Sequence, residues 1–264
     1  MERIEGQVVD QEELAKQVLS WITCAKRPLT SSELQHTLGV EVGESVLDED
    51  NFPQVEDIVS VCSGLVTVDE KITSFDWSTI RHRNDLSEHK KKRFPDAETM
   101  IAMACITYLS FNIYPKGPCL TDNEFEGRLQ ISKLYDYAAH NWGHHARVAP
   151  STCTRVLDFL QQKEKVEASI QTLFSETVWK KSKTLFGWKS PEGMTSLHLA
   201  AYFGIKKVVT ALLQQAVDVD IKCENGKTPL SWAVKGGHET VVKLLLDNGA
   251  AVDAPNNHGW TPLW

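Results

Sequence analysis

The C-terminal part of the chain repeats one pattern at a fixed interval of 33 residues. Residues 193–200 read GMTSLHLA, and residues 226–233 read GKTPLSWA. A third copy begins at Gly259 as GWTPL, and the sequence ends at Trp264, inside that copy. A fixed period of this length is typical of stacked structural repeats, which cannot bury their apolar faces singly. The pattern therefore predicts a solenoid that presents a binding surface, in an array that the third copy leaves unfinished.

The repeated residues have the form G-x-T-P-L-H-x-A, and this form resembles the ankyrin repeat. Thr195 and Thr228 stand where each first helix needs a cap. Gly204 and Gly237, again 33 apart, stand where the chain must turn between paired helices. The expected bounds are residues 191–223 for repeat 1, 224–256 for repeat 2 and 257–264 for a truncated repeat 3.

The resemblance also implies which positions could face a partner. In ankyrin repeats these are the variable residues of the hairpin tips and of the concave face of the inner helices. Exposed aromatic side chains are common anchors of interfaces. Each position has an alternative, which is packing against a neighbouring repeat. The matching residues here are Met194, Tyr202, Phe203, Lys222, Glu224, Asn225, Lys227, Lys235 and Trp260.

Composition narrows the class of protein. A net charge of −7 argues against a general nucleic-acid binder, which usually carries a basic surplus. Residues 1–10 are polar and acidic, unlike a signal peptide, and the longest apolar stretch, residues 100–111, is far shorter than the ~20 residues of a membrane span. The six cysteines show no C-x-x-C pair. We therefore expect no membrane partner and an intracellular, cytoplasmic location with reduced thiols.

The N-terminal segment has the element order of a winged helix. Helical periodicity covers residues 11–27, and Thr30 with Glu33 forms a capping box for a second helix over 31–38. Pro53 opens a third helix that runs to residue 61, and residues 64–68 predict a strand. We assign residues 11–75 to this module, 76–185 to a helical bridge, and the whole chain to the mainly α class.

Particular residues in the first two regions resemble one family. The segments LSWI at 19–22, RPLT at 27–30 and GLV at 64–66 are similar to the winged-helix domain named for GPI inositol-deacylase in fungal proteins. The segment YDYAAHNWGHHAR at 135–147 is similar to the helical part that precedes their repeats. In that family the winged helix follows a NACHT nucleotide-binding domain and precedes ankyrin repeats, as in NLR-like signalling proteins. The resemblance implies a NACHT domain as a possible partner.

One segment departs from the family pattern. The family continues after the wing strand with a second strand, whereas residues 75–89 show no period of two and little apolar content. We hypothesise that residues 72–89 reflect a frameshift or a gene-model error. Such an error, together with the interrupted third repeat, would favour a gene fragment, and the flanking genomic sequence would decide this.

Chemical sites are poorly supported by the sequence. Residues 226–228 (GKT) end like a phosphate-binding loop, but Ile221 occupies the place of its first glycine. Asp136, His140 and His144 share a helical face, yet a zinc site needs about four ligands and no H-E-x-x-H pattern is present. Residues 43–47 (GESVL) lack the second glycine of a nucleophile elbow. We therefore expect no enzyme activity, no cofactor and no metal.

The third helix of the winged-helix module bears on nucleic-acid binding. A helix that contacts DNA bases would need basic side chains there, but this helix carries Glu56 and Asp57 and no lysine or arginine.

The expected function is protein–protein interaction through the ankyrin surface, in a relative of NACHT–ankyrin proteins without the NTPase domain. Two alternatives are a regulatory subunit that acts in trans on a NACHT ATPase, and a decayed gene fragment without selected function.

Overall fold

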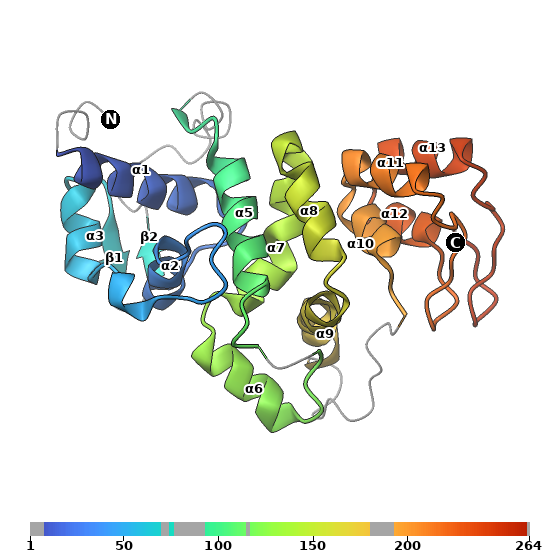
Figure 1. Ribbon diagram of the computed structural model, residues 1–264, viewed down its shortest axis with the longest axis horizontal. Helices are drawn as coiled ribbons and strands as arrows, with labels where there is room; N and C mark the ends of the chain where they lie inside the picture. The colour runs from blue at the N-terminus through green and yellow to red at the C-terminus, as the bar shows by residue number, and fades with distance from the viewer. Residues whose placement is uncertain (1–7, 70–73, 77–92, 115–116, 180–192, 263–264) are drawn as a thin grey trace.

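The computed structural model describes residues 8–69, 74–76, 93–114, 117–179 and 193–262. The described part is mainly helical, and its three regions lie in a row (Figure 1). The N-terminal module lies at one end, the bridge in the middle and the repeats at the other end.

The N-terminal module has the predicted winged-helix order. Its elements are α1 (Val9–Cys24), α2 (Ser31–Leu38), the 3-10 turn η1 (Glu49–Asn51), α3 (Val55–Val61), β1 (Thr67–Asp69) and β2 (Ser74–Asp76). The capping box is confirmed: Thr30 Oγ1 accepts from Glu33 N, and Thr30 N donates to the Glu33 carboxylate over 2.8 Å. Leu19, Trp21 and Ile58 are buried where the helices meet.

The second strand of the wing corrects one expectation. Phe75 pairs with Val68, and Asp76 with Thr67, in an antiparallel register. Three residues are too few to display the alternation of apolar and polar positions by which a strand is recognised in sequence. Residues 70–73 and 77–92 lie outside the described residues, so most of the segment of the frameshift hypothesis, 72–89, does too.

The bridge is built around two central helices. It comprises α5 (Ala97–Leu109), α6 (Asp122–Ile131), α7 (Tyr135–Val148), the 3-10 turn η2 (Pro150–Thr152), α8 (Cys153–Leu160) and α9 (Lys163–Trp179). Helix α5 packs along α7, and most of its residues are buried. Tyr108, Tyr135 and Tyr137 are fully buried between these helices.

The repeats form two stacked helix pairs. These are α10 (Ser196–Phe203) with α11 (Lys206–Gln214), and α12 (Pro229–Lys235) with α13 (Glu239–Asp247). Gly204 and Gly237 adopt φ values of +71° and +68° between the helices, which a residue with a Cβ disfavours. Helix α10 packs on α12 and α11 on α13, while α7 and α8 of the bridge pack on α10 and α11. The bridge therefore covers one side of the first repeat.

Candidate protein-interaction surface

Three aromatic side chains meet where helix α9 approaches the inner helices of the repeats. The ring of Phe174 lies 5.7 Å from that of Tyr202 on α10 and 5.4 Å from that of Trp232 on α12, between centroids. Tyr202 and Trp232 are themselves 5.8 Å apart, in an edge-to-face arrangement. Tyr202 is half-buried, and burial raises its pKa. The cluster thus joins both repeats to the bridge.

Two lysines flank this cluster. The Nζ atom of Lys227 lies 5.1 Å from the centroid of the Trp232 ring, and that of Lys235 lies 4.8 Å from the same centroid. Lys235 also lies over the ring of Phe174. Burial, and then repulsion by Lys227, lower the pKa of the Lys235 ammonium. We call these five residues, Phe174, Tyr202, Lys227, Trp232 and Lys235, the aromatic–lysine cluster.

The predicted hairpin-tip residues are exposed and joined to the chain that follows. Lys222 Nζ donates to the carbonyl of Pro255 over 3.0 Å. Asn257 donates from its side chain to the Glu224 carbonyl and from its backbone to the Asn225 carbonyl, over 2.6 and 3.2 Å. These bonds use backbone carbonyls of the tip, so the side chains of Glu224 and Asn225 stay at the surface. Trp260 is also exposed, at 61%.

Met194 and Phe203 do not belong to an exposed surface, which corrects the predicted set. Phe203 is 0% exposed and Met194 is 7% exposed. The Phe203 ring packs on Trp142 of α7, 4.9 Å between centroids, directly over Gly143. The bridge thus covers the side of repeat 1 that another repeat would cover in a longer array. The other seven predicted residues remain candidates for partner binding.

Trp232 and Phe174 were not predicted, and both are buried beneath the lysines of the cluster. Trp232 occupies the variable position x before the alanine of the repeat motif, where repeat 1 has Leu199. This replacement of leucine by tryptophan is the sequence feature that could have indicated its role. Phe174 gave no signal, because its place depends on how α9 folds back toward the repeats. Trp232 is 3% exposed, and its Nε1 atom has no hydrogen-bond partner among the described residues.

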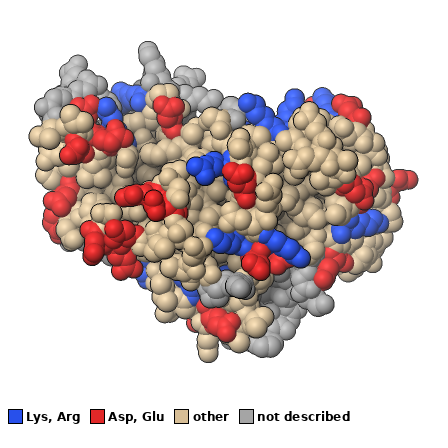
Figure 2. Space-filling view, viewed as in Figure 1, with Lys and Arg blue, Asp and Glu red and all other residues tan. Residues whose placement is uncertain are grey.

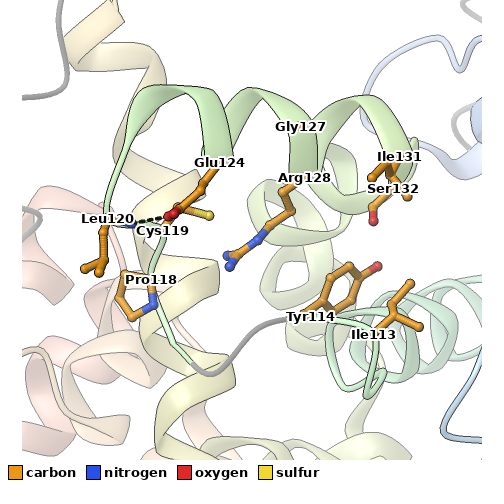
Figure 3. A pocket seen from close by; sticks show the side chains of 10 residues that line it. All are labelled: Ile113, Tyr114, Pro118, Cys119, Leu120, Glu124, Gly127, Arg128, Ile131 and Ser132. Atoms are coloured by element: carbon orange, nitrogen blue, oxygen red, sulfur yellow. Dashed lines mark hydrogen bonds between the residues drawn. The ribbon is translucent and has the colours of Figure 1, made fainter.

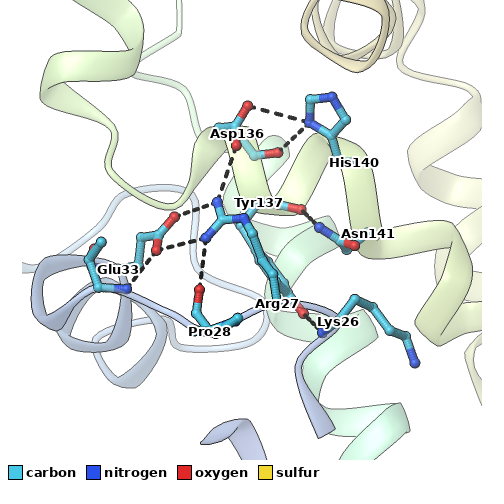
Figure 4. A network of polar contacts seen from close by, with 9 residues as sticks. Lys26, Arg27, Pro28, Glu33, Asp136, Tyr137, His140 and Asn141 are labelled. Carbon is cyan, nitrogen blue, oxygen red and sulfur yellow. Dashed lines mark hydrogen bonds and ion pairs between the residues drawn. The ribbon is translucent and has the colours of Figure 1, made fainter. Parts of the chain in front are cut away.

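The polar residues of α7 hold the winged-helix module to the bridge (Figure 4). Arg27 makes two hydrogen bonds to Glu33, of 2.6 and 3.0 Å, and one of 3.1 Å to Asp136. His140 Nδ1 donates to the backbone carbonyl of Asp136 over 2.9 Å. Nδ1 also lies 3.4 Å from the Asp136 carboxylate, and this side-chain contact, followed by the charges of His140 and Arg27, lowers the pKa of Asp136. These contacts tie Arg27 of the winged-helix module to the first turn of α7.

The neighbouring histidines turn to different parts of the bridge. His145 is fully buried, with Nδ1 2.5 Å from Glu98 and Nε2 2.9 Å from the Tyr137 hydroxyl. His144 instead packs its ring on Phe203, and burial lowers its pKa to about 4. Across the described ranges, no three His, Cys, Asp or Glu side chains gather as metal ligands.

The winged-helix end of the molecule is acidic. Glu56 and Asp57 are exposed on α3, and Figure 2 shows acidic side chains spread over this end. In a DNA-binding winged helix α3 would lie against the DNA, where these acidic side chains would repel the phosphate backbone. Among the described residues, no helix is long and apolar enough to cross a bilayer.

The chain thus carries an N-terminal winged-helix domain followed by ankyrin repeats. Comparison with protein-family models finds both parts separately: residues 197–264 match ankyrin repeats, in three copies. Residues 2–83 match the winged helix domain of GPI inositol-deacylase. No curated protein matches the chain. Ankyrin repeats bind proteins and are not catalytic, so the repeats indicate a protein–protein interaction module.

Proposed function

We propose that the chain is a non-catalytic module that binds a protein segment at the aromatic–lysine cluster and the adjoining hairpin tips. The observation that carries the proposal is the pair of lysines over one tryptophan. Both ammonium groups lie about 5 Å from the same ring centroid, and like charges at such a place repel each other. Burial, followed by the charge of Lys227, lowers the pKa of Lys235. A carboxylate placed near both would relieve that repulsion.

The chemistry of the surface selects an acidic segment with an apolar or aromatic side chain. Lys222 and Lys235 are exposed, and Lys227 is half-buried. Trp260 adds an exposed indole on the hairpin after repeat 2, and tryptophan is among the residues that contribute most at interfaces. Basic and aromatic groups side by side favour partners that carry both complementary features.

A peptide selection tests this surface without knowledge of the natural partner. Twelve-residue random peptides would be selected on the wild-type protein and measured on the double variant Lys227→Glu/Lys235→Glu. We expect acidic sequences with an apolar residue, and affinities at least tenfold weaker on the double variant. The matched control is Lys206→Glu/Lys207→Glu, which reverses two exposed charges on α11. Peptides that bind the wild type and the double variant equally well would overturn the proposal.

The biological setting that we propose is NACHT–ankyrin signalling, of the fungal NLR-like type. The matches to a winged helix of the GPI inositol-deacylase type and to ankyrin repeats support it, because the family resemblance places a NACHT domain before these two modules. A second role, regulation of a NACHT ATPase in trans, is favoured by the exposed acidic residues of α3. The variant Glu56→Lys/Asp57→Lys should weaken binding to a NACHT domain and leave peptide binding at the repeats unchanged.

A further inference from the structure

A pocket of about 570 Å³ lies beside helix α6, far along the chain from the ankyrin surface. Its walls come from the end of the loop after α5, from residues 117–120 and from one face of α6 (Figure 3). Most of the lining is apolar, and it includes Ile113, Pro118, Leu120 and Ile131. Leu120 and Ile131 are 85% and 71% exposed, so apolar side chains also line the entrance.

Arg128 is the charged group of this pocket. It is only 6% exposed, and Figure 3 shows its guanidinium directed into the space between α6 and residues 117–120. Its Nη2 atom donates to the carbonyl of Gly117 over 3.0 Å. Its Nε and Nη1 atoms are buried and make no hydrogen bond of normal geometry among the described residues, although the Tyr135 hydroxyl is a neighbour. A guanidinium has five N–H donors, and here the protein satisfies few of them.

The nearby polar groups do not neutralise this charge. The guanidinium lies over the ring of Tyr135, 5.5 Å from the centroid, which is a weak attraction. No carboxylate lies within 4.0 Å of Arg128 in the described part of the chain. Glu124 lines the same pocket, but its carboxylate accepts from the backbone of Leu120 over 2.9 Å. A buried charge without a counter-charge is costly, so the site is suited to an anion.

Other features show that the site is built in advance of binding. Gln171 of α9 both donates to and accepts from the backbone of Cys119, each over 2.8 Å, and this fixes one wall to the bridge. The Tyr114 hydroxyl also faces the pocket and has no hydrogen bond of normal geometry, although the hydroxyls of Tyr108 and Ser132 are its neighbours.

We propose that this pocket binds a small organic acid, with its carboxylate on Arg128 and an apolar body along Ile113, Pro118 and Ile131. A single guanidinium matches a single negative charge, and planar carboxylates suit its fork of donors. The volume lies within the range of small-molecule sites, which are mostly apolar with a few polar groups that fix the ligand. This site is separate from the ankyrin surface and does not depend on it.

The proposal can be tested with octanoate, which carries both features. Calorimetric titration would compare octanoate with octan-1-ol, which lacks the charge, and with acetate, which lacks the apolar body. We expect octanoate to bind at least tenfold more tightly than either. In Arg128→Met, octanoate should lose at least tenfold in affinity and octan-1-ol should not change. The control Arg155→Met removes an exposed arginine of α8 and should bind octanoate like the wild type.

A second variant tests the pocket independently, in case Arg128→Met does not fold. A Cβ atom at Gly127 would meet no atom within 4 Å, and the residue lines the pocket. Gly127→Leu should therefore fill the space, keep Arg128 and abolish octanoate binding in a folded protein. The proposal is wrong if octanoate does not bind the wild type, or if it binds either variant as it binds the wild type. It is also wrong if acetate matches octanoate, or if an acidic peptide binds in preference to it.

Discussion

His198 uses one ring nitrogen within the first repeat and the other to reach the second repeat. Nδ1 accepts from the backbone N–H of Thr195 over 3.0 Å, and Nε2 donates to the carbonyl of Lys227 over 3.1 Å. Nδ1 can accept only in the neutral ring, and burial lowers the pKa of His198 to about 4. Repeat 2 has Ser231 at the same place, whose hydroxyl reaches only Thr228 among the described residues. His198 thus adds a side-chain hydrogen bond between the two repeats.

Replacing His198 with serine should therefore change both the stability and its dependence on pH. At pH 7 we expect His198→Ser to lose about 1–3 kcal/mol of unfolding free energy, since two hydrogen bonds are lost. Below pH 6.5 the unfolded chain binds a proton that folded His198 does not, so wild-type stability falls as the pH drops toward 4.

Urea titrations at pH 7, 6, 5 and 4 would measure this effect. Between pH 7 and 4 the unfolding free energy should fall less steeply in His198→Ser than in the wild type. Part of the fall should remain, because burial also lowers the pKa of His36 and of His144 to about 4. The exposed residue His258 serves as control, and His258→Ser should keep the wild-type slope. Equal slopes in all three proteins would show that His198 does not control this pH range.

Two glycines make a matched test of backbone conformation. Gly127 lies within helix α6 and Gly237 has a φ of +68°, and neither has an atom within 4 Å of an added Cβ. Gly127→Ala should raise the unfolding free energy by about 0.5–1 kcal/mol, because alanine favours the helix. Gly237→Ala should lower the unfolding free energy by about 1–2 kcal/mol, because alanine is strained in the left-handed conformation that Gly237 adopts. Thermal melts of both variants, shifted in opposite directions, are the expected result.

At the scale of elements, the contact of α7 with α10 decides how the bridge meets the repeats. An added Cβ at Gly143 would lie 2.1 Å from the ring of Phe203. Gly143→Ala should therefore destabilise the protein by about 1–3 kcal/mol through overpacking, although alanine is the better helix former. In a Phe203→Leu background the same change should cost at least 1 kcal/mol less. Denaturant titration of the four proteins would give the coupling, and additive effects would refute the contact.

The same contact shows what could and could not be predicted from sequence. The capping box at Thr30 is local, so the sequence pattern predicted it. The helices of the repeats and the turns at Gly204 and Gly237 followed from the 33-residue period and the resemblance to ankyrin repeats. The burial of Phe203 depends on Gly143, which lies 60 residues earlier, and no local pattern carries that information. The sequence around Arg128 likewise indicates a solvent-exposed residue of a polar helix. Its burial depends on the position of residues 117–120, which a local pattern does not reveal.

At the scale of the whole molecule, the packing becomes weaker toward the last helices that the structure describes. Repeat 1 is held between the bridge and repeat 2, and its Val208 and Val209 are fully buried. At the equivalent positions of repeat 2, Val241 is fully buried, but Val242 is only half-buried. Leu246 is 37% exposed. Because local opening follows the amount of buried apolar contact, the two repeats should open at different free energies.

Hydrogen exchange would show this difference directly. We expect the amides of α12 and α13 to exchange faster than those of α10 and α11, since repeat 2 can open while repeat 1 stays packed on α7 and α8. Val241→Ala removes a fully buried side chain and should accelerate exchange in α12 and α13 while leaving α1–α3 unchanged. Residues 226–256 that exchange more slowly than residues 193–222 would contradict the gradient. Uniform acceleration in the variant would instead show that the chain opens as one cooperative unit.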